Sequence, residues 1–172
     1  YEIRLSLVGS EMCIRDSNIA MLSGNKMAQV SERRESGYKR ALEKHGFRVR
    51  EEWIVDCQFD PSTAMQKAME LKHRYPEIDA FFCASDGIAI GAIDGLMQLG
   101  MQVPQDVAVA GFDDFTISKY IHGGITSVKQ YPYEMGVACA NTVISMIDGN
   151  RVPDWIPMEY KLMKRASTKL KL

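Results

Sequence analysis

The sequence predicts an α/β protein in which a parallel β-sheet is covered by helices on both faces. Short, almost continuously apolar segments alternate along the chain with longer segments of helical periodicity. Strands that are apolar on both sides are typical of parallel sheets, because such sheets lie between layers of helix. The chain of 172 residues is 46% hydrophobic and 25% charged, which fits one domain with a substantial core.

The first half of the chain is predicted to form two strand–helix pairs. Residues 18–23 and 53–57 are short apolar strands. The first helix follows a polar loop and ends at Gly46, a residue type favoured at helix C-termini. The second helix begins at Pro61, which suits a first helical turn, and ends before Pro76. The buried faces are expected to consist of Tyr38, Ala41, Leu42 and His45 in the first helix, and Ala64, Met65, Ala68, Met69 and Leu71 in the second.

Three further strands and two helices are predicted in the second half. One helix begins near Asp86, whose side chain suits an N-cap, and ends at Gly100. A short helix covers residues 115–120. The strands are expected at 78–83, 107–112 and 125–129, and the buried residues of the first helix are expected to be Ile88, Ala92, Leu96 and Leu99.

Residues 131–149 have the pattern of a helix with two apolar faces. One face carries Met135, Cys139, Thr142 and Met146, and the other carries Val137, Ala140, Ile144 and Ile147. A helix that covers one side of a sheet needs only one such face. We therefore expect this helix to pack on a further layer of protein that the given sequence does not contain.

Charge and composition exclude several classes of function. The net charge is −1 and the pI about 6.4, so this chain carries no basic stripe that would bind nucleic-acid phosphates. No apolar run approaches the ~18 residues of a membrane span and no signal-peptide core is found, which favours a cytoplasmic protein without a membrane partner. The four widely spaced cysteines, Cys13, Cys57, Cys83 and Cys139, indicate buried thiols and not a disulfide framework or a zinc site.

The sequence contains no motif of catalysis or cofactor binding. The three histidines, His45, His73 and His122, lack the spacing of a metal site. No Gly-x-Ser-x-Gly elbow is present, and no Gly-x-Gly-x-x-Gly follows a predicted strand. The glycines between Gly87 and Gly95 lie inside a predicted helix, where close packing explains them better than phosphate binding. We expect no enzyme activity, no cofactor and no metal.

Polar residues at the ends of two predicted strands mark a candidate ligand site. Asp113 and Asp114 follow one strand, and Ser85 and Asp86 follow another. The carboxyl ends of parallel strands meet at one edge of the sheet, where α/β proteins bind small ligands. The two neighbouring aspartates also fit an acid–base pair, but adjacent residues leaving a strand point in different directions.

Five motifs are distributed between residues 18 and 168. They are Arg34-Glu-Ser-Gly-Tyr38 followed by Ala41-Leu42, Ala84-Ser-Asp-Gly-Ile-Ala-Ile-Gly-Ala92, Val103-Pro-Gln-Asp-Val107 with Gly111-Phe-Asp-Asp114, Thr126-Ser-Val-Lys-Gln130, and Arg165-Ala-Ser-Thr168. Each motif alone is weak. In this order and spacing they resemble the effector-binding domain of lactose-repressor-type (LacI/GalR) transcription regulators, which shares the fold of type I periplasmic sugar-binding proteins.

The resemblance implies a set of ligand-binding residues. In this family the arginine that matches Arg34 donates a fork of hydrogen bonds to the ligand, and the carboxylate that matches Asp113 accepts bonds from ligand hydroxyls. Ser85 matches a polar position of the ligand cleft, and Phe59 matches an aromatic whose ring covers the sugar or purine face. Gln130 is expected to contact the ligand or the hinge.

The residues themselves leave other roles open. Arg34 also fits a solvated side chain, although a cation near a helix N-terminus opposes the helix dipole by ~0.3–1 kcal/mol. Phe59 also fits the core. Capping is the default role for Asp86, and Ser85 fits a cap as well. For Asp114 we expect a capping or structural role.

The resemblance also implies how the chain is divided. Residues 18–130 match the C-terminal effector-binding subdomain, and residues 131–150 match a helix of the other, largely missing subdomain. Residues 151–168 return to the C-terminal subdomain, and residues 169–172 form a tail. Residues 1–17 show no regular pattern and resemble translated adapter sequence, so we expect them to be foreign to the protein.

The function implied by the resemblance is that of a ligand sensor. A small molecule, a sugar in preference to a purine, closes a cleft between subdomains and shifts the DNA affinity of a homodimer, whose helix-turn-helix is absent from this chain. The alternatives are a transport-type sugar receptor of the same fold and, less favoured, an enzyme of doubly wound fold. The dimer interface is expected to include Ile88, Ile90, Tyr120 and Ile121.

Overall fold

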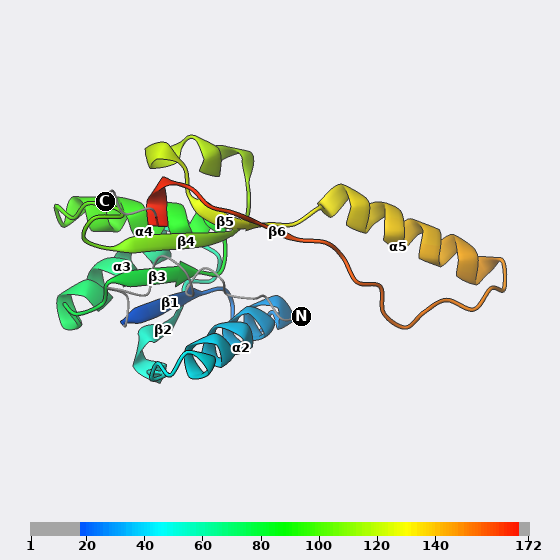
Figure 1. Ribbon diagram of the computed structural model, residues 1–172, viewed down its shortest axis with the longest axis horizontal. Helices are drawn as coiled ribbons and strands as arrows, with labels where there is room; N and C mark the ends of the chain where they lie inside the picture. The colour runs from blue at the N-terminus through cyan, green and yellow to red at the C-terminus, as the bar shows by residue number, and fades with distance from the viewer. Residues whose placement is uncertain (1–17, 169–172) are drawn as a thin grey trace.

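A computed structural model describes residues 18–168 as a six-stranded sheet with helices on both faces, which confirms the predicted fold class (Figure 1). The strand order is β2-β1-β3-β4-β5-β6, and the first five strands are parallel. The edge strand β6 pairs antiparallel with β5, which was not predicted. The strands are β1 (Ile19–Ser23), β2 (Ile54–Asp56), β3 (Ala80–Cys83), β4 (Ala108–Asp113), β5 (Thr126–Lys129) and β6 (Lys161–Met163).

The helices of the sheet layers follow the strands in alternation. They are α2 (Gln29–Lys44), α3 (Pro61–Arg74) and α4 (Asp86–Gln98). Helices α3 and α4 pack side by side, and α2 lies on the other face of the sheet (Figure 1). Four 3₁₀ helices complete the layers: η1 (Glu51–Trp53), η2 (Thr116–Lys119), η3 (Ile121–Gly123) and η4 (Ala166–Thr168). The short helix predicted after residue 115 is therefore a 3₁₀ helix.

Local sequence explains where the helices begin. Asp60 caps α3 by accepting a bond from the Thr63 amide at 2.7 Å, and Pro61 occupies the first turn. Ser85 caps α4 by accepting a bond from the Ile88 amide at 3.2 Å. The expectation that Asp86 is the cap was wrong, because the helix already includes Asp86.

Two glycines allow α3 and α4 to lie in close contact. A Cβ atom on Gly91 would lie 2.0 Å from the carbonyl oxygen of Pro61, and one on Gly95 would lie 2.6 Å from that of Met65. No larger residue fits at either position without displacing α3. The packing explanation is therefore confirmed for Gly91 and Gly95, but not for Gly87, where an added Cβ atom would have no neighbour closer than 3.7 Å.

Several predicted burials were wrong. His45 and Leu99 are C-caps exposed to solvent, because each lies beyond the last turn that faces the sheet. Met65 and Met69 are only partly buried. Ile88 belongs to α4 and is completely buried, as predicted for this helix, so its predicted place in the dimer interface was wrong.

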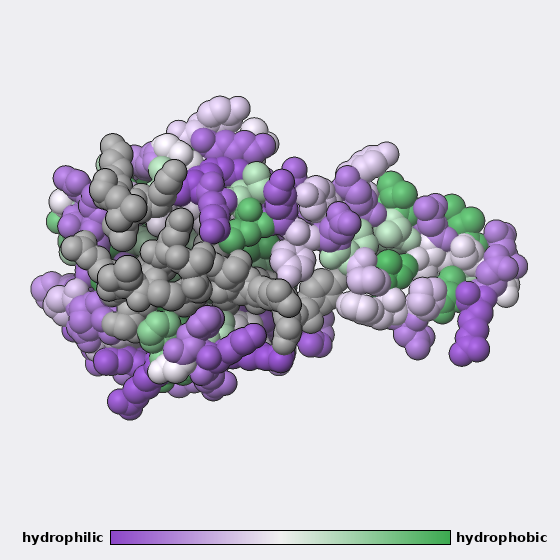
Figure 2. All heavy atoms as spheres, in the orientation of Figure 1, coloured by the Kyte–Doolittle hydropathy of each residue, from purple (hydrophilic) through white to green (hydrophobic). Residues whose placement is uncertain are grey.

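Helix α5 (Pro132–Ile147) projects away from the sheet, and a long extended segment leads back from it to β6 (Figure 1). None of its residues is buried. Apolar side chains are exposed on both of the predicted faces, for example Met146 on one and Ile144 on the other. Figure 2 shows hydrophobic residues on the visible surface of this helix. The prediction that this helix carries more apolar surface than one contact needs is confirmed.

Some predictions concern residues outside the described range. Residues 1–17, with Cys13, and the tail 169–172 are not described. Between residues 18 and 168, no helix has the length and apolar character needed to cross a membrane. Within the same range, no group of three or more histidine, cysteine or acidic side chains is arranged to hold a metal ion.

Candidate functional site

Three of the predicted ligand-binding side chains meet at the carboxyl edge of the sheet. The Nη2 atom of Arg34 lies 2.9 Å from Oδ1 of Asp113, and Nε2 of Gln130 donates to the same oxygen at 3.3 Å. Arg34 also donates through Nη1 to the carbonyl oxygen of Ala84. Arg34 and Asp113, which the resemblance assigned to one ligand site, therefore lie in contact, while their role in ligand binding stays a prediction.

Arg34 lies in the second turn of α2, because the helix begins at Gln29 and not close to Arg34. The predicted conflict with the helix dipole therefore does not arise, since that effect is confined to the first turn. The side chain is only 10% exposed, and its guanidinium carbon lies 4.0 Å from the ring centre of Phe112. Burial lowers the pKa of Arg34, and the charge of Asp113 opposes this shift. A solvated arginine is excluded.

Asp113 is the last residue of β4 and has a backbone φ of 97°, followed by 55° at Asp114. Both values lie in the region that favours glycine. Burial raises the pKa of Asp113, and the neighbouring Arg34 opposes this shift. The carboxylate is held at the sheet edge as the acceptor of a charge-assisted bond.

The other two predicted ligand residues lie at the same edge with different contacts. Ser85 follows Ala84, whose carbonyl binds Arg34, but the Ser85 hydroxyl is used as the cap of α4. Phe59 is half-buried against the core, and its ring lies on Gly24, the residue after β1. A Cβ atom on Gly24 would lie 2.1 Å from the ring. Core packing and ligand contact are both compatible with this position of Phe59.

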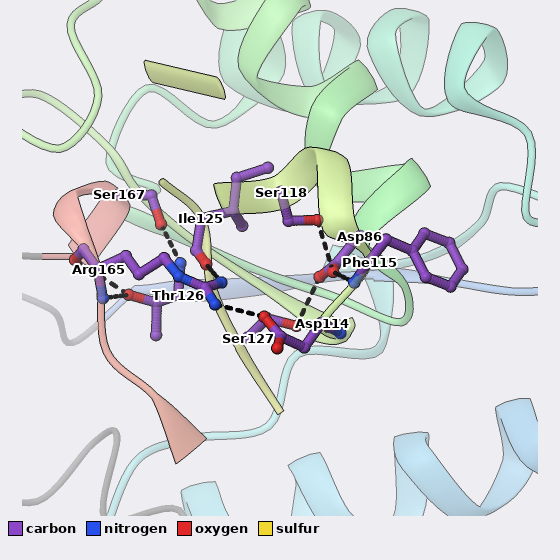
Figure 3. Close-up of polar contacts among 9 residues, drawn as sticks. All are labelled: Asp86, Asp114, Phe115, Ser118, Ile125, Thr126, Ser127, Arg165 and Ser167. Atoms are coloured by element: carbon purple, nitrogen blue, oxygen red, sulfur yellow. Dashed lines mark hydrogen bonds and ion pairs between the residues drawn. The ribbon is translucent and has the colours of Figure 1, made fainter. Parts of the chain in front are cut away.

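A polar network behind this edge was not predicted from the sequence (Figure 3). Asp86 is completely buried, and its Oδ2 atom accepts bonds from the Phe115 amide at 2.7 Å and the Ser118 hydroxyl at 2.6 Å. Its Oδ1 atom accepts a bond from the Ser127 hydroxyl at 2.6 Å. Asp86 thus anchors the loop after β4 to the start of α4.

Asp114 has a structural role, which is one of the two roles expected for it; the other was helix capping. Its side chain is 2% exposed and pairs with Arg165, and its amide donates to the Ser127 hydroxyl at 3.0 Å. It caps nothing, since η2 has no side-chain cap. The only sequence signal for these partners was that Ser127 and Arg165 lie within two of the five motifs.

Comparison with known protein families gives a match over nearly the whole described chain. The family model of the periplasmic binding protein-like domain matches residues 17–168. Among curated proteins, the ribose operon repressor of Haemophilus influenzae is 30% identical over 129 residues, which is 75% of this chain and 39% of that protein. The repressor PurR of Yersinia pestis is 32% identical over 154 residues, 87% of this chain and 44% of that protein. The chain thus spans less than half the length of these relatives.

Solved structures of transcription regulators are also similar to this chain. The transcriptional repressor AscG of Escherichia coli is 31% identical with a TM-score of 0.83, over 95% of this chain and 59% of that one. The structure of the regulator CelR in complex with cellobiose is 32% identical with a TM-score of 0.85, over 95% of this chain and 49% of that one. The chain therefore belongs to the periplasmic binding protein-like domain family, in the form in which LacI/GalR-type transcription regulators carry it.

Proposed function

We propose that this chain is the ligand-sensing part of a transcription regulator that binds a sugar at the carboxyl edge of the sheet. The observation that carries the proposal is the Arg34–Asp113 pair, with Gln130 beside it. A guanidinium fork beside a carboxylate offers donors and acceptors at fixed directions, which suits neighbouring hydroxyl groups.

The relatives support a sugar as effector. One relative is named as a ribose operon repressor, and one similar structure is titled as a cellobiose complex. Several other relatives are named as the transcriptional repressor PurR and not after a sugar, and a purine stays the second candidate. Phe59 would cover the face of either ligand, and Ser85 would contribute a polar group beside Arg34.

The rest of the proposed regulator would lie in sequence that precedes Asn18. We assign residues 18–130 and 151–168 to one effector-binding subdomain and the helix at 131–150 to the other. The unburied α5 supports this assignment, because it needs a covering layer. The DNA-binding helix-turn-helix would precede that layer, and the protein would act in the cytoplasm. A transport-type receptor of the same fold remains the second candidate.

The decisive experiment uses the full-length protein. Isothermal titration calorimetry with D-ribose, cellobiose, hypoxanthine and guanine should identify a binding class. Replacing Asp113→Ala should weaken binding of that ligand by ~1.5–3 kcal/mol, the usual scale for hydrogen bonds to a charged group. The exposed Asp94→Ala on α4 is the matched control and should leave affinity unchanged. Failure of all four to bind, or equal affinities of the Asp113→Ala variant and wild type, would refute the proposal.

A homodimer is part of the proposed function. Tyr120 is 77% exposed, and Ile90 and Ile121 are partly buried beside the core. Such residues can form the apolar centre of a two-fold interface. The full-length protein should sediment as a dimer above micromolar concentration, and Tyr120→Asp should shift it toward monomer. Sedimentation as a monomer in the wild type would contradict this part.

A further inference from the structure

The turn that carries Asp113 has an unfavourable backbone. Asp113 and Asp114 are two consecutive non-glycine residues with positive φ, at 97° and 55°. Such conformations cost free energy and persist only where the surrounding structure fixes them. The contacts that fix this turn therefore also determine where the Asp113 carboxylate points.

Polar contacts to Asp114 and Phe115, the two residues after Asp113, hold the turn (Figure 3). Arg165 binds the Asp114 carboxylate, and the Ser127 hydroxyl accepts a bond from the Asp114 amide. Asp86 binds that same hydroxyl at 2.6 Å and the Phe115 amide at 2.7 Å. Residues 114 and 115 are thus anchored immediately after Asp113.

Two glycines make room for the side chains of Asp86 and Arg165. A Cβ atom on Gly111 would lie 2.3 Å from Oδ1 of Asp86. A Cβ atom on Gly124, where φ is 101°, would lie 2.6 Å from the Cδ atom of Arg165. Both β4 and the loop before β5 are therefore shaped around Asp86 and Arg165.

Arg165 also ties the turn to the chain that returns from α5. It lies two residues after β6, and its amide donates to Oγ1 of Thr126 at 2.8 Å. Its Nη1 atom donates to the carbonyl oxygen of Ile125 at 2.7 Å. Through its amide and its guanidinium, Arg165 therefore joins the returning segment, the start of β5 and the Asp113–Asp114 turn.

We infer that Asp86 and Arg165 are positioning residues for Asp113: together they hold the left-handed turn that presents this carboxylate to Arg34 and link it to the segment returning from α5. The inference rests on the proposed function for the use of Asp113 in effector binding. Its geometric part, the dependence of the Arg34–Asp113 contact on Arg165, can be measured without any ligand.

The test is a double-mutant cycle in the full-length protein, measured by urea unfolding. The four proteins are the wild type, Arg34→Met, Arg165→Met and the double variant. If Arg165 positions Asp113, the factor by which Arg34→Met raises the unfolding equilibrium constant should be about fivefold or more smaller in the Arg165→Met background. A purely structural Arg165 would leave the two effects independent, because Arg34 and Arg165 bind different carboxylates.

The control and the milder variant keep the test decisive. Lys67→Met removes a surface ion pair with Glu70 on α3. Its effect on the unfolding equilibrium constant should be independent of Arg34→Met, so the two factors should multiply in the double variant. If Arg165→Met does not fold, Ser127→Ala replaces it in the cycle, since it removes only the hydroxyl shared by Asp86 and Asp114. Independent effects in the cycle would overturn the inference even if an effector is found, and coupling would support it even if none of the tested ligands binds.

Discussion

Helices α4 and α5 are both rich in apolar and small residues, but only α4 is covered. Eight residues of α4 are buried, among them Ile88, Gly91 and Leu96, whereas α5 buries none. The difference lies in their partners, because α4 packs on α3 and on the sheet while α5 projects from it (Figure 1). The apolar composition of a helix thus predicts that it needs a packing partner. The topology of the chain decides whether residues 18–168 themselves provide that partner.

The largest expected difference is in hydrogen exchange. In the isolated 172-residue chain, amides of Val137 to Ile147 should exchange at least ~10³-fold faster than those of β4. A helix of 16 residues without tertiary cover is marginally stable, while central strands open only with global unfolding at ~5–15 kcal/mol. Exchange measured by mass spectrometry tests this. Equal protection in a monomer would mean that α5 has a partner within the chain.

A matched pair of isoleucines tests the same contrast by stability. Ile88 is completely buried and Ile144 is 56% exposed. Ile88→Ala should lower the free energy of unfolding by ~2–5 kcal/mol, because it leaves a cavity in the core. Ile144→Ala should change it by less than ~0.5 kcal/mol. Urea unfolding of the isolated chain measures both, and a large effect at Ile144 would show that α5 is covered.

Thiol chemistry distinguishes the two regions as a function of pH. Burial raises the pKa of Cys57 to about 12 and holds the pKa of Cys83 well above its usual value, whereas Cys139 on α5 is exposed. At pH 8 only about one Cys57 in ten thousand would be thiolate, the reactive form. Iodoacetamide should therefore label Cys139 at least ~100-fold faster than Cys57 or Cys83.

The thiol-labelling experiment is more informative when the isolated chain and the full-length protein are compared. Labelling of Cys57 should rise with pH up to about 12, because deprotonation is limiting. In the full-length protein, Cys139 should also be protected if the proposed second subdomain covers α5. Rapid labelling of Cys139 in both forms would leave α5 uncovered and remove this support for the subdomain.

Two glycine-to-alanine substitutions give the smallest expected effects and opposite signs. Gly91→Ala places a methyl group against the Pro61 carbonyl and should destabilise the chain by ~1–3 kcal/mol. A Cβ atom on Gly136 in α5 would point into open space within the described part of the chain, so Gly136→Ala should favour the helix by up to ~1 kcal/mol. Circular dichroism and thermal unfolding report both changes. A destabilising Gly136→Ala would indicate a close neighbour of α5.

Sequence reasoning recovered the strands and helices because their signals are local. Apolar runs marked β1 to β5, and Pro61 and Gly46 marked helix ends correctly. The edge strand β6 was missed because Lys161–Met163 is three residues long and gains its strand character only from pairing with β5. The sequence suggested a helix start close to Arg34, but α2 begins earlier, at Gln29, because Ala28 supplies no side-chain cap that would have marked its start.

The site was predicted only as far as its residues carried a family motif. Arg34 and Asp113 could be paired in this way, although they are 79 residues apart. Asp86 looked like a cap because Ser-Asp commonly begins a helix, and nothing nearby indicated that its partners, Ser118 and Ser127, lie 32 and 41 residues away. Burial of a charge depends on such distant partners, so a single sequence does not reveal it.

The distance in sequence between Arg34 and Asp113 has a thermodynamic consequence. The two groups share one site only when α2 and β4 are assembled, so a molecule held by both is held by the folded chain alone. By mass action such a molecule stabilises the fold, by about 2.7 kcal/mol at a hundredfold excess over its dissociation constant. If the proposed effector binds there, its cellular concentration would also affect how long the protein survives proteolysis.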